Sequence, residues 1–322
     1  MSAAPRRARL SALAKINLGL KVLGRRADGY HELRTVFQTV SLADALEVEF
    51  TPSRSTSIAV RSEPEIPGNL VERGARLALD AIRVTGRVEF RLRKRIPMGA
   101  GLGGGSSDAA AVLLALPVLA GKNLPLSVLI RLASELGSDV PFFLLGGTAV
   151  ALDRGTEVYP LPDRPPTSGV LVAPAVHVST AEAYQALGRG PGGLTSETEQ
   201  YMISGFQSCA WELGQALPGT PAPATGENDF ESVVFSRHPR LKSLKRRLEK
   251  LGAHPAMLSG SGSTLFGLFA GRGEAERARQ SIPEERVFVI SLVSRARYRA
   301  LWWRRLSPHI AGKVWPPQSR YA

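Results

Sequence analysis

Residues 97–107, PMGAGLGGGSS, form a glycine-rich run whose residue types suit contact with a polyanion. Without Cβ atoms, successive backbone N–H groups can close around a phosphate, and a following helix adds free amides and a positive dipole end. Ser106 or Ser107 is expected to cap that helix, with Asp108 in its first turn, and both hydroxyls could reach a phosphate oxygen or Mg²⁺. We therefore predict a polyphosphate-binding loop made of Pro97, Met98, Gly99, Ala100, Gly101, Leu102, Gly103, Gly104, Gly105, Ser106 and Ser107.

A dinucleotide-binding turn, a P-loop and a purely structural loop each fit this glycine-rich run less well. Residues 99–104 match the GxGxxG dinucleotide pattern, but the segment about 20 positions later, LAGKNLPL, has no carboxylate to hold a ribose. A P-loop would continue with lysine, whereas Gly104 is followed by Gly-Ser-Ser. Tight packing of strand on helix would require one or two glycines, not five. Because the loop has no lysine, its neutralising charge is expected from a metal ion or another segment.

Four segments together resemble one enzyme family. PMGAGLGGGSSDAA resembles the signature of the small-molecule kinase superfamily that includes galactokinase, homoserine kinase and mevalonate kinase. Three more segments narrow the resemblance to the 4-diphosphocytidyl-2-C-methyl-D-erythritol kinases of the non-mevalonate isoprenoid pathway: AKINLGLKVLGRRADGYHEL (14–33), SELGSDVPFFLLGGTAV (134–150) and LSGSGSTLFGLF (258–269). The resemblance implies a two-domain α+β fold with its active site in the cleft between domains. It also implies ATP- and Mg²⁺-dependent phosphorylation of the substrate's 2-hydroxyl; a homoserine, mevalonate or sugar kinase is the nearest alternative.

The resemblance implies a catalytic lysine–aspartate pair, which falls on Lys15 and Asp139. In LAKINLGLKV, Lys15 and Asn17 share one face of a predicted strand whose other face is apolar, so their face is expected to line a cleft. Asn17 is expected to bind the substrate near its diphosphate or its reacting hydroxyl. Asp139 follows a helix-ending glycine, and capping of a helix with Pro141 just inside would also account for it. In the implied mechanism Asp139 accepts the hydroxyl proton and Lys15 stabilises charge.

Recognition of cytosine is implied for residues just after the Asp28-Gly29 turn. Tyr30 offers a stacking face, and His31 can form hydrogen bonds with the edge of the base. Tyr184 is expected on the other face of the base, and Thr180 is expected to contact the substrate. Without the resemblance, a buried packing tyrosine and an ordinary surface histidine would be the favoured interpretation of the Tyr-His pair.

Two segments of the second half also match the family. SGSGST (259–264) resembles the superfamily's third motif, which closes on the reaction centre, although an ordinary turn between helix and strand accounts for it as well. NDFE (228–231) matches a family segment, and Asp229 as the cap of the following helix is sufficient to account for it.

Hydrophobic periodicity predicts a first domain over residues 1–165 and a second, an α+β sandwich, over residues 166–322, with the boundary in DRPPTSG (163–169). The first is expected to contain strands at 13–22, 35–42, 45–50, 56–62 and 86–97, and helices at 69–82, from Ser106 and at 127–137, before a turn and a strand within 138–152. The second is expected to contain strands at 170–174, 265–270 and 287–293, helices at 181–187, 230–251 and 274–282, and a flexible stretch at 218–228. The tail after Pro308 is predicted to be loosely held.

The formal charge of +13, carried mostly by arginine, calls for an acidic partner such as nucleic acid, an anionic membrane or a nucleotide. KSLKRRLEK (242–250) is interpreted as the solvated face of a helix whose leucines at 241, 244, 248 and 251 point inward. RARYRALWWRRL (295–306) is interpreted as an amphipathic helix that packs its aromatic residues. Stacking of those residues on RNA bases is the rival interpretation, and it leaves the glycine-rich loop unexplained.

Cysteine and histidine content argues against a metal centre built by the protein. Cys209 is the only cysteine, and the histidines at 31, 177, 238, 254 and 309 lack the spacing of a metal site. The basic N-terminal stretch is interrupted by Lys15 and Asn17 and makes a poor signal peptide, and no apolar run could span a bilayer. We expect a cytoplasmic enzyme that binds a small-molecule substrate and ATP, without nucleic acid or membrane partners, as a monomer or weak homodimer.

Overall fold

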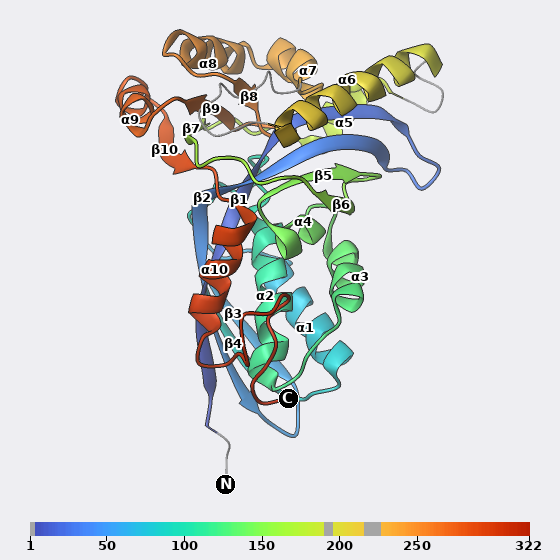
Figure 1. Cartoon of the computed structure of the whole chain (residues 1–322), viewed down its shortest axis with the longest axis vertical. Helices are drawn as coiled ribbons and strands as arrows, with labels where there is room; N and C mark the ends of the chain where they lie inside the picture. The colour runs from blue at the N-terminus through green and yellow to red at the C-terminus, as the bar shows by residue number, and fades with distance from the viewer. Residues whose placement is uncertain (1–3, 190–195, 216–226) are drawn as a thin grey trace.

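The computed structural model describes residues 4–189, 196–215 and 227–322, which form two bodies stacked along the long axis of the molecule (Figure 1). Within these residues the first body contains a six-stranded sheet: β3 (Ser57–Glu63), β4 (Gly86–Arg93), β2 (His31–Pro52), β5 (Thr148–Leu152) and β6 (Glu157–Pro160) in spatial order, with β1 (Arg6–Arg25) paired to β2. The second body contains a four-stranded antiparallel sheet, in the order β10 (Arg286–Ser291), β7 (Ser168–Ala173), β9 (Leu265–Phe269) and β8 (Ala256–Leu258). The predicted two-domain α+β organisation is confirmed.

Alternation of apolar and charged residues builds the large sheet. Along β4, Val88, Phe90 and Leu92 are buried while the alternating arginines at 87, 91 and 93 are exposed, as a period of two predicts. β2 runs without a break through the two strands predicted at 35–42 and 45–50, because it pairs with β1 along nearly its whole length.

Helices pack on this sheet around one that is buried on nearly every side. That central helix is α2 (Gly104–Ala120), whose residues from Ser107 to Leu119 are all buried. It is packed against α1 (Leu70–Ile82), α3 (Leu126–Leu136) and α4 (Val140–Leu145). The short helix α4 lies where a turn was predicted, although the capping alternative for Asp139 placed a helix at this point of the chain. No helix in the described part of the chain is both long and apolar enough to cross a bilayer.

The second body carries its helices over the small sheet. They are α5 (Thr180–Leu187), α7 (Phe230–Arg237), α8 (Pro239–Lys250) and α9 (Arg272–Gln280), and α6 (Ser196–Gln215), which was not predicted, lies beside the β1–β2 hairpin (Figure 1). The helix predicted over 230–251 is two helices, because Pro239 cannot continue the hydrogen bonding of α7. In α8, Leu241, Leu244 and Leu248 are buried as predicted. Of the predicted flexible stretch, residues 218–226 lie outside the described residues.

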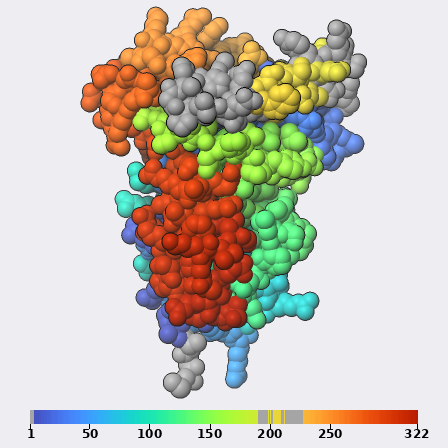
Figure 2. All heavy atoms as spheres, in the orientation of Figure 1, coloured from blue at the N-terminus to red at the C-terminus, as the bar shows by residue number. Residues whose placement is uncertain are grey.

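The C-terminal segment returns to the first body and covers one of its faces (Figure 2). In α10 (Arg295–Leu306), Tyr298 and Trp302 are buried in the core of the first body, which confirms the amphipathic interpretation. The prediction of a loose tail is wrong, because the Oγ of Ser319 donates a hydrogen bond to the carbonyl of Val118 at 2.8 Å and Trp315 packs against the core of the first body. Residues 295–322, which were predicted as part of the second domain, thus pack on the first body. The domain boundary near residue 165 remains a proposal.

The long β1–β2 hairpin joins the two bodies. Leu10 and Leu13 of β1 belong to the core of the first body, whereas Leu20 and Val22 belong to the core of the second. The backbone amide of Leu20 also donates to the carbonyl of Glu227 at 2.9 Å, which holds the chain before α7 against β1. The middle of β1 thus lies at the junction of the two bodies.

Candidate active site

The glycine-rich loop connects β4 to α2 and lines a cleft of about 500 Å³. Gly103, with a φ of 67°, is the N-cap of α2, so the predictions that Ser106 or Ser107 caps the helix and that Asp108 lies in its first turn are wrong. The left-handed backbone at Gly103 begins the helix inside the glycine run. Because the first amides of a helix have no acceptor within it, the N–H groups of residues 104–106 are available at this end of the cleft.

Close packing inside the protein requires some of these glycines. A Cβ on Gly101 would lie 2.0 Å from the carbonyl oxygen of Ser259, and one on Gly103 would lie 3.1 Å from Cγ of Lys15. A Cβ on Gly99 would meet nothing within 4 Å. The loop is therefore short of side chains partly because it is pressed between Lys15 and the segment at residue 259, a reason that the sequence does not reveal.

Lys15 and Asp139, predicted as the catalytic pair, lie together in this cleft. The Nζ of Lys15 is 3.6 Å from Oδ2 of Asp139, and the lysine side chain is only 4% exposed, against 33% for the aspartate. Burial lowers the pKa of Lys15 from its ordinary value, and the neighbouring Asp139 carboxylate partly offsets that effect. Asp139 occupies the N-cap position of α4, but its side chain makes no capping hydrogen bond, so capping does not account for it.

Bulges in β1 set the direction of the Lys15 and Asn17 side chains. The pairing of β1 with β2 shifts register between Leu13 and Lys15 and again between Asn17 and Gly19, and such bulges redirect side chains. The Nζ of Lys15 donates to Oδ1 of Asn17 at 2.7 Å, and Nδ2 of Asn17 donates to Oγ1 of Thr35 at 2.8 Å. The backbone amide of Lys15 is bonded to the carbonyl of Leu102 at 3.0 Å, so strand and loop hold each other in place.

A second, wider cleft of about 960 Å³ adjoins the first. It is lined by Tyr30 in the turn before β2, by His31 at the start of β2, and by residues of α5. The two clefts share five lining residues: Leu33, Ser106, Asp139, Thr180 and Tyr184. Asp139 therefore stands at the place where a ligand on the glycine-rich loop and a ligand on the Tyr30 side would meet.

The aromatic residues predicted to bind cytosine are arranged differently from the prediction. His31 stacks on Tyr184, with ring centroids 4.4 Å apart and an interplanar angle of 19°. A base can therefore stack on that face of Tyr184 only if His31 turns aside. Tyr30 is 51% exposed, and the guanidinium of Arg154 lies 4.9 Å from its ring centroid. Partial burial, with a smaller contribution from Arg25, lowers the pKa of His31 below its usual 6.5.

The segment SGSGST docks on the glycine-rich loop, so it is more than a connecting turn. The Oγ of Ser259 donates to the carbonyl of Gly101 at 2.9 Å, and the Oγ of Ser261 lies 2.9 Å from Oγ1 of Thr180. Asn228 holds the segment from behind, since its Nδ2 donates to the carbonyls of Leu258 and Gly260 at 2.8 Å each. The contact between Ser259 and Gly101 brings residues 158 positions apart to one wall of the cleft.

The predicted capping role of Asp229 is wrong. Its side chain makes no hydrogen bond to α7; instead it pairs with Lys21 at 3.2 Å and Arg189 at 2.6 Å, and accepts a hydrogen bond from the backbone amide of Val22 at 2.9 Å. Asp229 therefore holds the N-terminal end of α7 against β1. This contact between distant segments replaces the capping hydrogen bond that aspartate favours at the start of a helix.

Two lining groups were missed by the sequence reasoning. Lys94, just ahead of the glycine-rich loop, is buried between Asp44 and Asp108 and is 2.7 Å from Oδ2 of Asp108. It supplies a cation from a neighbouring segment, as the absence of lysine in the loop suggested, but both of its partners are carboxylates. Asn69 lines the far side of the cleft, and its buried Nδ2 has no hydrogen-bond partner within the described residues. Nothing in the local sequence distinguishes Asn69 from an ordinary helix cap.

Comparison with known proteins agrees with this geometry. The model of the GHMP kinases N terminal domain matches residues 69–147, and that of the GHMP kinases C terminal matches residues 214–286. A 4-diphosphocytidyl-2-C-methyl-D-erythritol kinase from Solibacter usitatus is 58% identical over 317 residues, which cover 98% of each chain.

Solved structures point to the same group. A crystal structure of 4-(cytidine 5'-diphospho)-2C-methyl-D-erythritol kinase matches with 40% identity and a TM-score of 0.72, over 88% of this chain and 98% of that one. Homoserine kinase from Cytophaga hutchinsonii, at 19% identity, shares the fold with a TM-score of 0.67 over 89% of this chain and 97% of its own. The resemblance found in the four sequence segments is thus confirmed over almost the whole chain, which belongs to the 4-diphosphocytidyl-2-C-methyl-D-erythritol kinase family within the GHMP kinases.

Proposed function

We propose that the protein transfers the γ-phosphoryl group of ATP to the 2-hydroxyl of 4-diphosphocytidyl-2-C-methyl-D-erythritol, giving the 2-phosphate and ADP. The observation that carries this proposal is the position of Lys15 and Asp139 relative to the two clefts. The pair lies beside the glycine-rich loop, and Asp139 also lines the cleft that contains Tyr30 and His31. A donor phosphate and an acceptor alcohol bound in the two clefts would meet at this carboxylate.

Asp139 acts as the proton acceptor in this proposal. As the hydroxyl oxygen forms its bond to the γ-phosphorus, the hydroxyl proton passes to Asp139. The bond between the γ-phosphorus and the oxygen bridging it to the β-phosphate breaks, and that electron pair leaves with ADP. The Lys15 ammonium, 3.6 Å from the carboxylate and fixed by Asn17, stabilises negative charge on the transferring group. Asn17 also lines the cleft, and in this proposal its amide contacts the substrate near the reacting hydroxyl.

The glycine-rich loop and the start of α2 hold the triphosphate. Free amides at residues 104–106 and the positive end of the α2 dipole suit phosphate oxygens, and Ser106 lies on the same wall. The Oγ of Ser107 is buried and finds no hydrogen-bond partner in the part of the chain that the structure describes, but Ser107 lines neither cleft, so its contact with a phosphate oxygen or a metal ion stays a prediction.

Mg²⁺ accompanies ATP in this proposal and supplies charge neutralisation on the phosphates. Among the described residues, no group of three or more His, Cys, Asp or Glu side chains could hold a metal ion. The oxygen donors that line the cleft near the loop are the Ser106 hydroxyl and the separate carboxylates of Asp108 and Asp139, a sparse set that fits an ion held mainly by phosphate oxygens and water. Mg²⁺ is therefore expected to arrive with the nucleotide.

The wider cleft binds the cytidine end. Tyr30 provides an exposed ring for stacking, and Tyr184 provides a second ring once His31 turns from it toward the edge of the base. Thr180 lies at the border of the two clefts, where it can contact the substrate between its base and its alcohol. The oligomeric state and the cytoplasmic location expected from the sequence stay predictions.

The test is ATP consumption with the diphosphocytidyl substrate beside homoserine, mevalonate and galactose at equal concentrations. We expect turnover only with the cytidine compound. Preferred turnover of any of the other three alcohols would assign the protein to another substrate class, and the absence of turnover with all four would contradict the proposal.

A further inference from the structure

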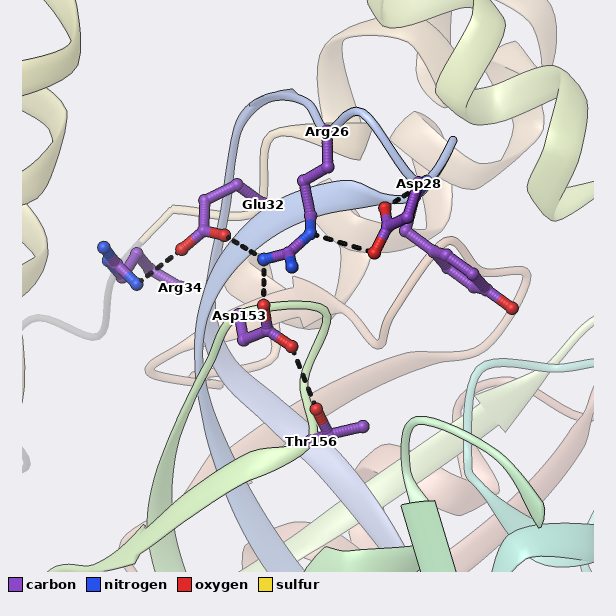
Figure 3. A network of polar contacts seen from close by, with 7 residues as sticks. Arg26, Asp28, Glu32, Arg34, Asp153 and Thr156 are labelled. Atoms are coloured by element: carbon purple, nitrogen blue, oxygen red, sulfur yellow. Dashed lines mark hydrogen bonds and ion pairs between the residues drawn. The ribbon is translucent and has the colours of Figure 1, made fainter. Parts of the chain in front are cut away.

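Arg26 lies at the centre of a polar network that joins two turns of the chain (Figure 3). Its Nε donates to Asp28 at 3.3 Å within the β1–β2 turn, and its Nη1 donates to Glu32 at 3.0 Å near the start of β2. Nη1 also donates to Asp153 in the turn between β5 and β6. The second carboxylate oxygen of Asp153 accepts a hydrogen bond from Thr156 at 3.0 Å. One guanidinium thus gathers three carboxylates from two turns that are more than 100 residues apart in sequence.

This network fixes the backbone that carries Tyr30 and His31. The second oxygen of Asp28 accepts a hydrogen bond from the amide of Tyr30 at 3.1 Å, and the amide of Arg26 donates to the carbonyl of Tyr30 at 2.7 Å. Tyr30 and His31 are therefore flanked by Asp28 and Glu32, both of which contact Arg26. A change at Arg26 would release both ends of this short segment.

The β5–β6 turn contributes to the same cleft from the opposite side. Its Arg154 holds a guanidinium 4.9 Å from the ring centroid of Tyr30 and donates to the carbonyl of Ser134 at 3.4 Å. The carbonyl of Asp153 accepts a hydrogen bond from the amide of Leu33 at 2.7 Å. The two turns therefore form one unit, in which Arg26 sets the separation between the Tyr30 segment and Arg154.

Stability alone does not account for this arrangement. The Arg26 side chain is 35% exposed, and exposed ion pairs contribute little to the free energy of unfolding. Its three partners do, however, each lie next in sequence to a residue that lines the cleft of Tyr30: Asp28 beside Gly29, Glu32 beside His31, and Asp153 beside Arg154. An exposed network in this place has more influence on the shape of a binding site than on the folding of the chain.

We infer that Arg26 is a positioning residue that fixes the Tyr30–His31 segment against the β5–β6 turn and thereby sets affinity and selectivity for the cytosine base. The inference rests on the proposed function. Arg26 takes no part in phosphoryl transfer, because its contacts lie at the cytidine end of the paired clefts.

The test compares Arg26→Met with the wild-type protein. We measure kcat, the KM values for the diphosphocytidyl substrate and ATP, and the inhibition constants of CDP, UDP and ADP. Because small displacements of a binding group can cost one to two orders of magnitude, we expect the substrate KM and the CDP inhibition constant to rise about tenfold or more. The preference for CDP over UDP should fall, while kcat, the ATP KM and the ADP inhibition constant stay within about twofold of wild type.

Two further variants separate positioning from general damage. Asp153→Asn removes the cross-turn ion pair, and asparagine tolerates the positive φ of 62° at this position, so it should weaken CDP binding in the same direction but less. Arg34→Met is the matched control. Arg34 pairs with the same Glu32, at 2.9 Å, but its contacts in Figure 3 do not include Asp28 or Asp153, so CDP binding should remain unchanged.

Each outcome either supports or overturns the positioning role. Equal weakening of CDP and ADP binding, or unchanged CDP binding and selectivity in Arg26→Met, would overturn the inference. If Arg26→Met does not fold, the outcome for Asp153→Asn against Arg34→Met decides it in the same way. Failure of the wild-type protein to turn over the diphosphocytidyl substrate and to bind CDP would instead contradict the proposed function itself.

Discussion

The two ends of the candidate active site are held by different kinds of contact. At the phosphoryl-transfer end, Lys15 is almost fully buried, and a backbone hydrogen bond joins it to the glycine-rich loop at Leu102. At the cytidine end, Tyr30 is half exposed, and ion pairs on the protein surface hold its segment. Buried contacts tolerate little displacement, because the interior is closely packed, whereas exposed ion pairs can be lost at small cost to folding. We therefore expect changes at the first end to affect turnover and stability, and changes at the second to affect substrate affinity.

The largest effect is expected at the catalytic pair. Lys15→Ala and Asp139→Asn should each lower kcat by about 10² to 10⁴, because they remove charge stabilisation or the proton acceptor, while ATP affinity stays nearly intact. Steady-state kinetics and nucleotide titration check this. Turnover near the wild-type level in either variant would break the assignment of this end to the chemistry.

The contact between the glycine-rich loop and the SGSGST segment can be tested by a matched pair of substitutions. Gly101→Ala places a Cβ 2.0 Å from the Ser259 carbonyl, whereas Gly99→Ala, at a similar positive φ, meets nothing within 4 Å. Both should incur backbone strain, but Gly101→Ala should cost about 1–3 kcal/mol more in the free energy of unfolding, because the clash forces the two segments apart. Urea denaturation measures the difference. Equal losses would mean that the segments are not tightly docked.

A moderate effect is expected for the stacking residue at the cytidine end. Tyr184→Leu should raise the substrate KM about tenfold, because loss of base stacking on an aromatic ring costs about 1–3 kcal/mol. Tyr184→Phe keeps the ring and serves as the control, with a KM near wild type. An unchanged KM in Tyr184→Leu, measured beside an unchanged kcat, would show that the base does not stack there.

The smallest effect concerns a buried carboxyl beneath the glycine-rich loop. Burial raises the pKa of Asp108 from 3.8 to about 7, although Lys94 opposes the shift. Between those values the folded protein holds a proton that the unfolded chain has released, so the contribution of Asp108 to stability falls as the pH rises from about 4 to 7. Asp108→Asn removes this loss.

Thermal unfolding at two pH values checks the prediction for Asp108. The difference in Tm between Asp108→Asn and wild type should become more positive between about pH 5 and pH 8. A difference that becomes more negative with rising pH would mean that the ion pair with Lys94 outweighs the cost of burial.

Local sequence patterns predicted most of the helices and strands, and the glycine-rich loop, Lys15 and Asp139, which they singled out, do line one cleft. The alternation in β4 and the leucines of α8 follow directly from which faces are buried. The glycine-rich loop was placed correctly between strand and helix. Six-residue α4 was missed, because its short apolar run is followed at once by Gly146 and Gly147 and has too few positions to show a helical period.

Contacts between distant segments account for the errors. The cap of α2 shifted to Gly103 because a left-handed residue there begins the helix earlier than the first serine. Asp229 forms ion pairs with Lys21 and Arg189 instead of capping α7. The C-terminal tail packs on the first body. In both cases the partners are distant in sequence, so local patterns could not indicate them. The stack of His31 on Tyr184 likewise depends on residues 153 positions apart.

The most direct test of the proposed phosphoryl transfer is a crystal structure of the protein with a non-hydrolysable ATP analogue, Mg²⁺ and the diphosphocytidyl substrate. We predict the triphosphate against the amides of residues 104–106, the base beside Tyr30, and the 2-hydroxyl between the γ-phosphate and Asp139. A triphosphate bound away from residues 97–107, or a reacting hydroxyl out of reach of Asp139, would contradict this mechanism.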